Sequence, residues 1–326
     1  MQGKEAPEQQ ANVKSSAGVD VSKDWLDAHV WPCEEPLRVA NTKEGIQKLK
    51  RWLQRYDLKV VIIEATGKWH RELYRSLYQS NIPAVVIDPY KARMFAQALG
   101  ILAKTDQIDA SVLSRYGYMV GPAVRPPKPE VIEQVAELVT GRDTAVKEQT
   151  RLQNQLSAAT DGFFRKHLRQ RLARIAKDIA ALEQEIIARI GADPELTRRY
   201  EILISIPGVG PTTAATLIAR MGELGALPDK EITMLAGLAP IANQSGNHDG
   251  KRLIWGGRKP VRRMLYLAAV SASRWNPSLK LFYDRLEEKG KEAKVALIAV
   301  ARKLIILANT LIAEDRLWQK IPPKNA

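Results

Sequence analysis

The chain has 326 residues, 45% of them hydrophobic and 26% charged, and its formal net charge is +14. Its one cysteine excludes an intrachain disulfide framework and a cysteine-rich zinc site, and its four histidines argue against an imidazole-rich metal site. We expect no membrane span, because no apolar run reaches about 18–20 residues. Any bound metal should have oxygen ligands, which favours Mg²⁺ or Mn²⁺.

The polar residues 1–15 lack the apolar core of a signal peptide and read as a disordered lead-in. Beyond them, the length suggests two domains with a connecting element. Three strands followed by alternating helices and buried strands predict a ribonuclease-H-like α/β sheet. In chain order the predicted elements are strands at 17–22, 25–33 and 36–41, a helix at 42–56 capped by Thr42, a strand at 58–67, a helix at 69–80, a strand at 83–88, and helices at 90–101 and 106–119.

A segment with four prolines, GPAVRPPKPE at 121–130, breaks this pattern and predicts a domain boundary. Residues 130–192 are almost entirely helical in pattern, and their apolar side chains recur at steps of three and four. This spacing predicts a coiled coil or helical hairpin, and it leaves open whether the arm packs within one chain or between two. Those apolar positions include Leu172, Ile175, Ile179, Leu182, Ile186 and Ile190.

Residues 195–315 read as a mostly helical C-terminal domain. The run ILISIPGVGPTTAATLIARMG places Gly208 and Gly210 in a turn between two apolar helical stretches. Backbone N–H groups of such a turn, with a helix N-terminus behind them, can bind a nucleic-acid phosphate, as in a helix-hairpin-helix. An ordinary helix–turn–helix corner is the alternative.

Positive charge is concentrated in this C-terminal part. Residues 191–326 carry 21 basic and 13 acidic side chains, and KRLIWGGRKPVRR at 251–263 has six basic residues and no acidic one. We infer a polyanion partner, most simply nucleic acid, with a solubilising basic surface as the alternative. The expected backbone contacts are Lys251, Arg252, Arg258, Lys259, Arg262 and Arg263, with Trp255 available to stack on a base.

Four carboxylates occupy positions where a charge is costly. Asp20 lies within a strand between two valines, and Glu64 ends the apolar run VVIIE, so each needs a partner or a metal. Asp106 and Asp109 of AKTDQIDA lie one helical turn apart, with Cβ atoms about 5–6 Å from each other. Helix capping is the alternative for this pair. If the two central strands are neighbours, the four carboxylates could hold two Mg²⁺ or Mn²⁺ ions about 3.5–4 Å apart at a phosphate.

The motifs GVDVSK, IIEATG, AKTDQIDA and IPGVGPTTA, followed by GLAP and SG, together resemble one family. It is the DEDD insertion-sequence transposases, relatives of the pilin-gene DNA invertases that include bridge-RNA-guided recombinases. The resemblance implies a domain similar to Holliday-junction resolvases at 16–122, an arm at 130–192 and a C-terminal transposase domain at 195–315. It also implies that Asp20, Glu64, Asp106 and Asp109 are the Mg²⁺ ligands. The implied partners are donor and target DNA and a structured guide RNA, in a homo-oligomer (dimer or tetramer) in the cytoplasm of a bacterial or archaeal host.

The family uses a serine nucleophile in its C-terminal domain, and the serine before glycine in LAPIANQSGNHDGKR is Ser245. A Ser-Gly turn exposes its hydroxyl, and the basic run beginning at Lys251 could bind the scissile phosphate. Without the resemblance, Ser245 would read as an ordinary polar loop residue. The expected function is therefore a transposase or recombinase that cuts and rejoins DNA strands. The alternative is a junction endonuclease that uses the same carboxylates with water as nucleophile.

Overall fold

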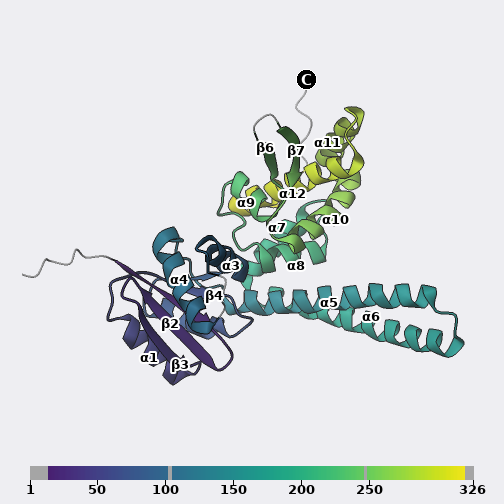
Figure 1. The fold of residues 1–326 in the computed structure, drawn as a ribbon. Helices are drawn as coiled ribbons and strands as arrows, with labels where there is room; N and C mark the ends of the chain where they lie inside the picture. The colour runs from purple at the N-terminus through teal and green to yellow at the C-terminus, as the bar shows by residue number, and fades with distance from the viewer. Residues whose placement is uncertain (1–13, 102–104, 246–247, 320–326) are drawn as a thin grey trace, which may run out of the picture. The chain divides into compact units, whose positions relative to one another are not determined.

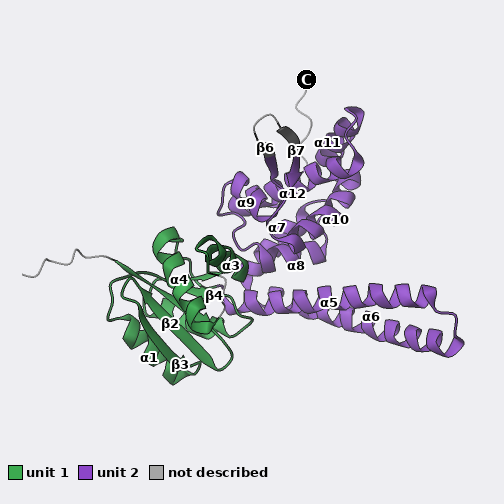
Figure 2. Cartoon of the chain, viewed as in Figure 1, with its two compact units in different colours: residues 1–127 green, residues 128–326 purple. Residues whose placement is uncertain are grey.

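The computed structural model describes residues 14–101, 105–245 and 248–319, with the side chains of residues 243–251 outside that description. The chain divides into two compact units, residues 1–127 and residues 128–326 (Figure 2). We call them the N-terminal unit and the C-terminal unit. The division falls within the predicted proline-rich boundary segment, and the helical arm belongs to the C-terminal unit.

The N-terminal unit is built on a mixed five-stranded sheet with the strand order β3-β2-β1-β4-β5 (Figure 1). Strand β1 pairs antiparallel with β2 and parallel with β4. The predicted α/β class is confirmed, and the sheet is compatible with a ribonuclease-H-like fold. Its elements are β1 (Ser15–Val21), β2 (Trp25–Trp31), β3 (Glu35–Ala40), α1 (Lys43–Leu53), β4 (Leu58–Glu64), α2 (His70–Gln79), β5 (Ala84–Ile87), α3 (Pro89–Ala98) and α4 (Asp106–Val120).

Each predicted element of this unit is present, with ends that differ by a few residues. Thr42 caps α1 as expected, because its side chain accepts a hydrogen bond from the Gly45 N–H at 3.2 Å. Ser15 is a small correction: the structure places it in β1, where it is buried, and not in the lead-in. Residues 1–13 of that lead-in lie outside the described residues.

Alternation along the strands gives the sheet two different faces. Val19 of β1 and Val61 of β4 point into one core, which also contains Leu49 of α1 and Leu73 of α2. The intervening residues of the strands face α4 instead, and Ile62 packs there with Leu113 in a second, smaller core. This second face carries the predicted carboxylates.

The arm is an antiparallel helical hairpin within one chain, formed by α5 (Glu130–Ala158) and α6 (Gly162–Gly191) (Figure 1). Its outer part has a small core of its own, made by Leu152, Leu168 and Ile175. Asp161 begins α6 by accepting a hydrogen bond from the Phe164 N–H at 2.8 Å. The intrachain alternative for the apolar seam is therefore the one observed here.

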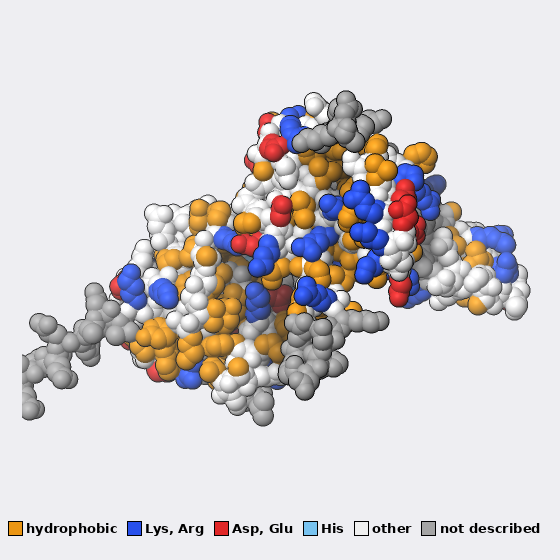
Figure 3. Space-filling view, turned by 90° about the horizontal axis from the view of Figure 1, so that it is seen from above, with side chains coloured by type: hydrophobic (Ala, Val, Ile, Leu, Met, Phe, Trp, Pro, Cys, Tyr) orange, Lys and Arg blue, Asp and Glu red, His pale blue; other side chains and the backbone are white. Residues whose placement is uncertain are grey.

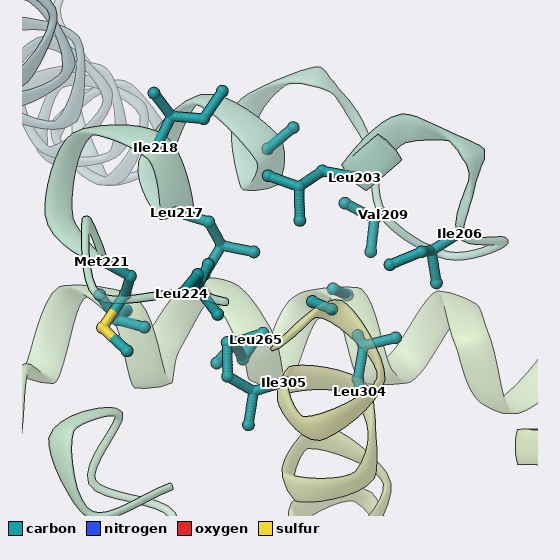
Figure 4. Packing of buried hydrophobic residues seen from close by; sticks show 14 of the residues in the cluster. Leu203, Ile206, Val209, Leu217, Ile218, Met221, Leu224, Leu265, Leu304 and Ile305 are labelled. Carbon is teal, nitrogen blue, oxygen red and sulfur yellow. The ribbon is translucent and has the colours of Figure 1, made fainter. Parts of the chain in front are cut away.

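The rest of the C-terminal unit is a helical domain with one two-stranded sheet. Its core brings together Leu217 of α8, Leu265 of α10 and Ile305 of α12 (Figure 4). The hairpin of β6 and β7 has no counterpart among the predicted elements. The elements are α7 (Pro194–Ser205), α8 (Pro211–Arg220), α9 (Asp229–Leu235), β6 (Pro240–Ser245), β7 (His248–Ile254), α10 (Lys259–Trp275), α11 (Pro277–Glu288) and α12 (Ala293–Ala313).

Helix α12 is the element that bears on the expectation of no membrane span. Among the described residues it alone is long and apolar enough by length and composition. In the structure its residues Val300, Leu304, Ala308 and Leu311 are buried in the core of the C-terminal unit. Its apolar character is explained by this core position.

Candidate active site

Four side chains form a row across neighbouring strands on the face of the sheet that α4 covers. Val19 pairs with Ile63, so the next residues along the parallel strands, Asp20 and Glu64, end side by side. Across the antiparallel pairs, Asp20 lies opposite Asp27 of β2, and Asp27 lies opposite Arg38 of β3. Cross-strand partners project from the same face, so the order across the sheet is Glu64, Asp20, Asp27, Arg38.

Helix α4 brings the second pair of carboxylates to this face. A Cβ on Gly18 would come closer than 3.0 Å to the Ala110 carbonyl oxygen, and one on Gly117 would come as close to the Ser16 hydroxyl. Glycine at both positions therefore lets the helix lie directly on β1. Asp106 and Asp109 occupy the first turn of α4, close to the ends of β1 and β4.

Capping chemistry is present at the start of α4 as well. The Thr105 hydroxyl accepts a hydrogen bond from the Ile108 N–H at 3.3 Å, and carboxylates in a first turn are favoured by the helix dipole. Capping is therefore observed at this motif, and the role of Asp106 and Asp109 as metal ligands stays a prediction. The preceding residues of AKTDQIDA, 103 and 104, lie outside the described part of the chain.

A buried histidine ties α4 to the sheet. His29 of β2 places Nδ1 2.9 Å from the Ser114 hydroxyl of α4 and Nε2 3.0 Å from the Glu34 carboxylate. Burial lowers the pKa of His29 and outweighs the raising effect of Glu34. The ring thus contacts Glu34 through Nε2 and the Ser114 oxygen through Nδ1, while the Ser114 hydroxyl donates to the Ser111 carbonyl at 2.7 Å. This chain of hydrogen bonds holds the helix that carries Asp106 and Asp109.

Electrostatics show that the carboxylates influence one another. Burial, together with the charges of Glu64, Asp109 and Asp106, raises the pKa of Asp20 to about 6 from its ordinary 3.8. Burial also raises the pKa of Asp27, while Arg38 acts against that shift and Asp106 adds to it. Nearby negative charges that raise a pKa in this way make a strong attraction for a cation.

The donor set suits a hard divalent cation, because it consists of carboxylate oxygens, two from the ends of neighbouring parallel strands and two from the first turn of α4. Among the described residues, however, no group of three or more Asp, Glu, His or Cys side chains already stands at metal-holding distances. Asp106 forms an ion pair with Arg38, whose Nη2 lies 3.6 Å from its Oδ2.

The basic residues of the 251–263 segment fall into two groups, those that bind other groups of the protein and those that are exposed. Arg258 donates two hydrogen bonds to the Glu223 carboxylate, at 2.6 and 2.7 Å, and a third to the Arg220 carbonyl. Arg262 donates to the carbonyls of Gly237 and Gly256. Both guanidinium groups thus stabilise the fold of the C-terminal unit. The sequence suggested phosphate contacts for both because it does not show these intrachain partners.

Other predicted contacts are free to meet a polyanion. Arg252, Lys259 and Arg263 are exposed, and the Trp255 side chain is 73% exposed. Lys259 and Arg263 project from the first turns of α10, where the helix dipole disfavours positive charge unless an anion is near. Figure 3 shows Lys and Arg side chains lying among exposed hydrophobic ones on the face that it draws.

The glycines of the predicted phosphate-binding turn differ from each other. Gly208 has φ +101°, and a Cβ there would lie 2.6 Å from the Cα of Ala272, so glycine is required for packing against α10. Gly210 precedes the first residue of α8 and has open space around it. Only Gly210 therefore faces room for a ligand.

Ser245 is the last residue of β6, and its backbone pairs with His248. Its side chain and that of Lys251 lie outside the described part of the structure. The nucleophile assignment stays a prediction from the sequence resemblance.

Sequence reasoning missed several residues that shape the carboxylate site. Asp27 and Arg38 looked like ordinary polar positions in alternating strands, and only the strand register places Asp27 beside Asp20 and Arg38 beside Asp27. A signal for Gly18 was available, because a glycine in a buried strand often marks close approach of another backbone. His29 carried no sequence signal, since its partner Ser114 is 85 positions away.

Comparison with known proteins gives consistent matches along the chain. A family model described as "Transposase", of the DEDD IS110 type, matches residues 17–165, and one described as "Transposase IS116/IS110/IS902 family" matches residues 200–284. The pilin gene-inverting protein of Moraxella bovis is 29% identical over 94% of this chain and 98% of its own length.

Proteins of insertion elements match shorter stretches. The uncharacterized 42 kDa protein of insertion element IS900 from Mycobacterium paratuberculosis is 34% identical, over 40% of this chain and 35% of its own length. The uncharacterized 43.6 kDa protein of IS110 from Streptomyces coelicolor is 29% identical, over 47% of this chain and 37% of its own length. The two family models and these relatives agree, and the chain belongs to the IS110-type family of DEDD insertion-sequence transposases.

Proposed function

We propose that this transposase cuts and rejoins DNA strands with Mg²⁺ or Mn²⁺ held by Asp20, Glu64, Asp106 and Asp109, and with Ser245 as the nucleophile. The observation that carries the proposal is the proximity of the four carboxylates: burial, and after it the charges of Glu64, Asp109 and Asp106, raise the pKa of Asp20 to about 6. Here one face of the sheet and one helix turn concentrate negative charge inside a strongly basic chain.

Each protein group has a distinct task in this reaction. Asp20 and Glu64 are fixed by paired strands, whereas Asp106 and Asp109 come from the first turn of a helix that glycines hold against β1. A divalent cation bound there would stabilise the charge that develops on the scissile phosphate. The protein would position the cation through backbone elements that cannot shift independently.

Ser245 would act as the nucleophile that replaces one phosphodiester bond of the DNA with a bond to the protein. Its hydroxyl oxygen forms an ester bond to the scissile phosphorus, its proton passes to a base or to solvent, and the bond from phosphorus to one deoxyribose oxygen breaks. That leaving oxygen takes up a proton. A hydroxyl of a second DNA end then attacks the phosphoserine, so rejoining needs no external energy source and restores the serine.

The proposed partners are donor and target DNA, a structured guide RNA and further copies of this chain. The exposed Arg252, Lys259 and Arg263 support a nucleic-acid partner, and a DNA substrate follows from the family. The Moraxella relatives are named for inverting a pilin gene, which supports recombination of DNA in place of simple cleavage. The RNA and the oligomer rest on the family resemblance.

A covalent adduct tests the proposal most directly. Wild-type protein with Mn²⁺ and a nicked DNA junction should give a protein–DNA species that survives denaturation, with peptide mapping placing the DNA on Ser245. Ser245→Ala should bind DNA and cation but form no adduct and no recombinant. Asp20→Ala should form neither adduct nor cut strand.

The matched control is Ser271→Ala, a serine within α10. It should leave the adduct intact. If Ser245→Ala still cuts DNA in a cation-dependent way and no adduct forms with wild-type protein, the enzyme is a junction endonuclease that uses water, and the serine proposal is wrong.

A further inference from the structure

Arg38 occupies the end of the row of charged residues on the sheet. Its Nε lies 3.6 Å from Oδ1 of Asp27, and its Nη2 lies 3.6 Å from Oδ2 of Asp106. Both distances exceed ordinary hydrogen-bond length, so the guanidinium neutralises two carboxylates without being fixed to either. The single positive charge of Arg38 is therefore shared between the carboxylates of Asp27 and Asp106.

The two partners of Arg38 differ in their freedom to move. The Asp27 side chain is 5% exposed and belongs to a central strand, and the Cζ of Arg38 lies 5.1 Å from the ring centroid of Trp25 on the same strand. The Asp106 side chain is 59% exposed and belongs to the first turn of α4. Arg38 is thus anchored by β2, while its contact with Asp106 can be exchanged.

Space for a ligand opens beside this guanidinium. A hollow with a volume of about 340 Å³ is lined by Arg38, Asp27, His29 and Gln107, among other residues of β2, β3 and α4. Its two acidic residues each have a partner, Asp27 with Arg38 and Glu34 with His29 and Arg115, so an anion entering there would meet the Arg38 guanidinium at the edge that adjoins Asp106. An arginine fork matches the geometry of phosphate oxygens.

We propose that Arg38 is a phosphate-binding residue of the carboxylate site, and that Asp106 covers it until a divalent cation takes that carboxylate. This inference rests on the proposed function, because it requires a cation on the four carboxylates. Cation binding would pull Asp106 away from Arg38, since a divalent charge attracts it more strongly than a shared guanidinium. Arg38 would stay paired with Asp27, and the guanidinium N–H groups released from Asp106 would bind a phosphate of the DNA backbone.

DNA binding with and without a divalent cation tests this exchange. Ca²⁺ and EDTA conditions should be compared on one DNA duplex of mixed sequence, for wild-type protein and Arg38→Gln. In Ca²⁺ the variant should bind about fivefold more weakly, because one charged contact is lost. Its slope of log affinity against log salt should also be shallower by about 0.9. In EDTA the two proteins should bind alike. Arg51→Gln on α1 is the control and should show no dependence on the cation.

A second measurement needs neither DNA nor activity. Titration of Mn²⁺ should show tighter binding to Arg38→Gln than to wild-type protein, by several-fold, because the variant no longer competes for Asp106. The double variant Arg38→Gln/Asp27→Asn should show the same gain without leaving a buried unpaired charge, which guards against loss of folding. The gain should exceed the purely electrostatic effect of removing one positive charge from this face, which Arg115→Gln measures, because Arg115 of α4 pairs with Glu34.

The results separate this inference from the function on which it rests. If wild-type protein shows no Mn²⁺ binding that Asp20→Asn removes, the carboxylate proposal fails, and the Arg38 inference fails with it. If that binding is present, Arg38 is tested alone. Equal weakening of DNA binding in EDTA and Ca²⁺, no weakening in either, or weaker Mn²⁺ binding by the double variant would each overturn it.

Discussion

Gly18 lies directly against the backbone of Ala110, so closely that a Cβ at residue 18 would come within 3.0 Å of the Ala110 carbonyl oxygen. Strand β1 and helix α4 therefore touch through their main chains, two residues before Asp20 and one residue after Asp109. The spacing of these two carboxylates is set by backbone contact, which is stiffer than packing through long side chains.

Gly18→Ala should destabilise the N-terminal unit by about 1–3 kcal/mol, because the helix must move away from the strand. It should also weaken Mn²⁺ binding, since Asp109 moves with the helix. Chemical denaturation and Mn²⁺ titration measure the two effects. Gly141→Ala is the control: this glycine is exposed within α5 with open space around it, and alanine there should add about 0.5–1 kcal/mol of stability. Wild-type stability and cation affinity in Gly18→Ala would contradict the argument.

Asp20→Asn should raise the melting temperature of cation-free protein at neutral pH. Burial and three neighbouring carboxylates raise the pKa of Asp20 to about 6, above the ordinary 3.8 of an unfolded chain. The folded protein then binds the extra proton, so wild-type stability falls as the pH rises from about 4 to above 6. The gain of the variant should therefore be absent at acid pH and complete at neutral pH.

The same variant should lose its response to a cation. Mn²⁺ should raise the melting temperature of wild-type protein and leave Asp20→Asn unchanged, because binding to the native state alone stabilises it. Thermal unfolding measures both effects. Asp24→Asn, an exposed aspartate between β1 and β2, serves as control and should behave like wild type. Equal stabilisation of Asp20→Asn by Mn²⁺ would remove this residue from the ligand set.

Arg263→Gln should change DNA affinity and Arg262→Gln should change stability, although the two residues are adjacent. Arg263 is exposed on α10, so its loss should reduce DNA affinity and make the salt slope shallower by about 0.9, with stability unchanged. Arg262 holds the carbonyls of Gly237 and Gly256, so its loss should lower the stability of the C-terminal unit. Fluorescence anisotropy over a salt series and thermal unfolding separate the two. An unchanged slope in Arg263→Gln would mean that this residue does not contact phosphate.

Glu223→Gln should lower the free energy of unfolding of the C-terminal unit by about 2 kcal/mol at pH 7, because two charged hydrogen bonds to Arg258 are lost. Burial alone would raise the pKa of Glu223, but the hydrogen bonds and charge of Arg258 outweigh it and lower the pKa below its ordinary 4.5. The stabilisation is present above that value and is lost as the pH falls through the lower folded value. Denaturation at several pH values should show the two proteins converging as the pH falls below the ordinary pKa of 4.5 and through the lower folded value. A difference that persists in acid would point to lost packing.

The sequence carried enough information for the N-terminal sheet and for its carboxylates. A near-continuous apolar run ending in Glu64 and an aspartate between valines both show where charge meets a buried strand. The row that extends to Asp27 and Arg38 depends on strand register, and register follows from packing across the whole sheet. It could not be inferred from either strand alone.

Charge density likewise predicted a basic region but not the task of each arginine. Arg258 and Glu223 are 35 positions apart, so their ion pair is visible only after the chain folds. Gly208 shows the same limit, because the turn motif gives no sign that Ala272 of α10 lies against it. Local pattern identified the segment, and long-range contact decided which of its residues remain available to a partner.

The length of the arm determines how far its tip would move if its base rotated. Helix α6 has 30 residues and is therefore about 45 Å long. Because α5 and α6 pack along each other, with a small core of their own in the outer part, the hairpin can turn as one piece. A rotation of about 10° at its base would move its tip by about 8 Å, which is more than two base-pair steps of duplex DNA. A small change of angle at the base would thus become a displacement on the scale of nucleic-acid register.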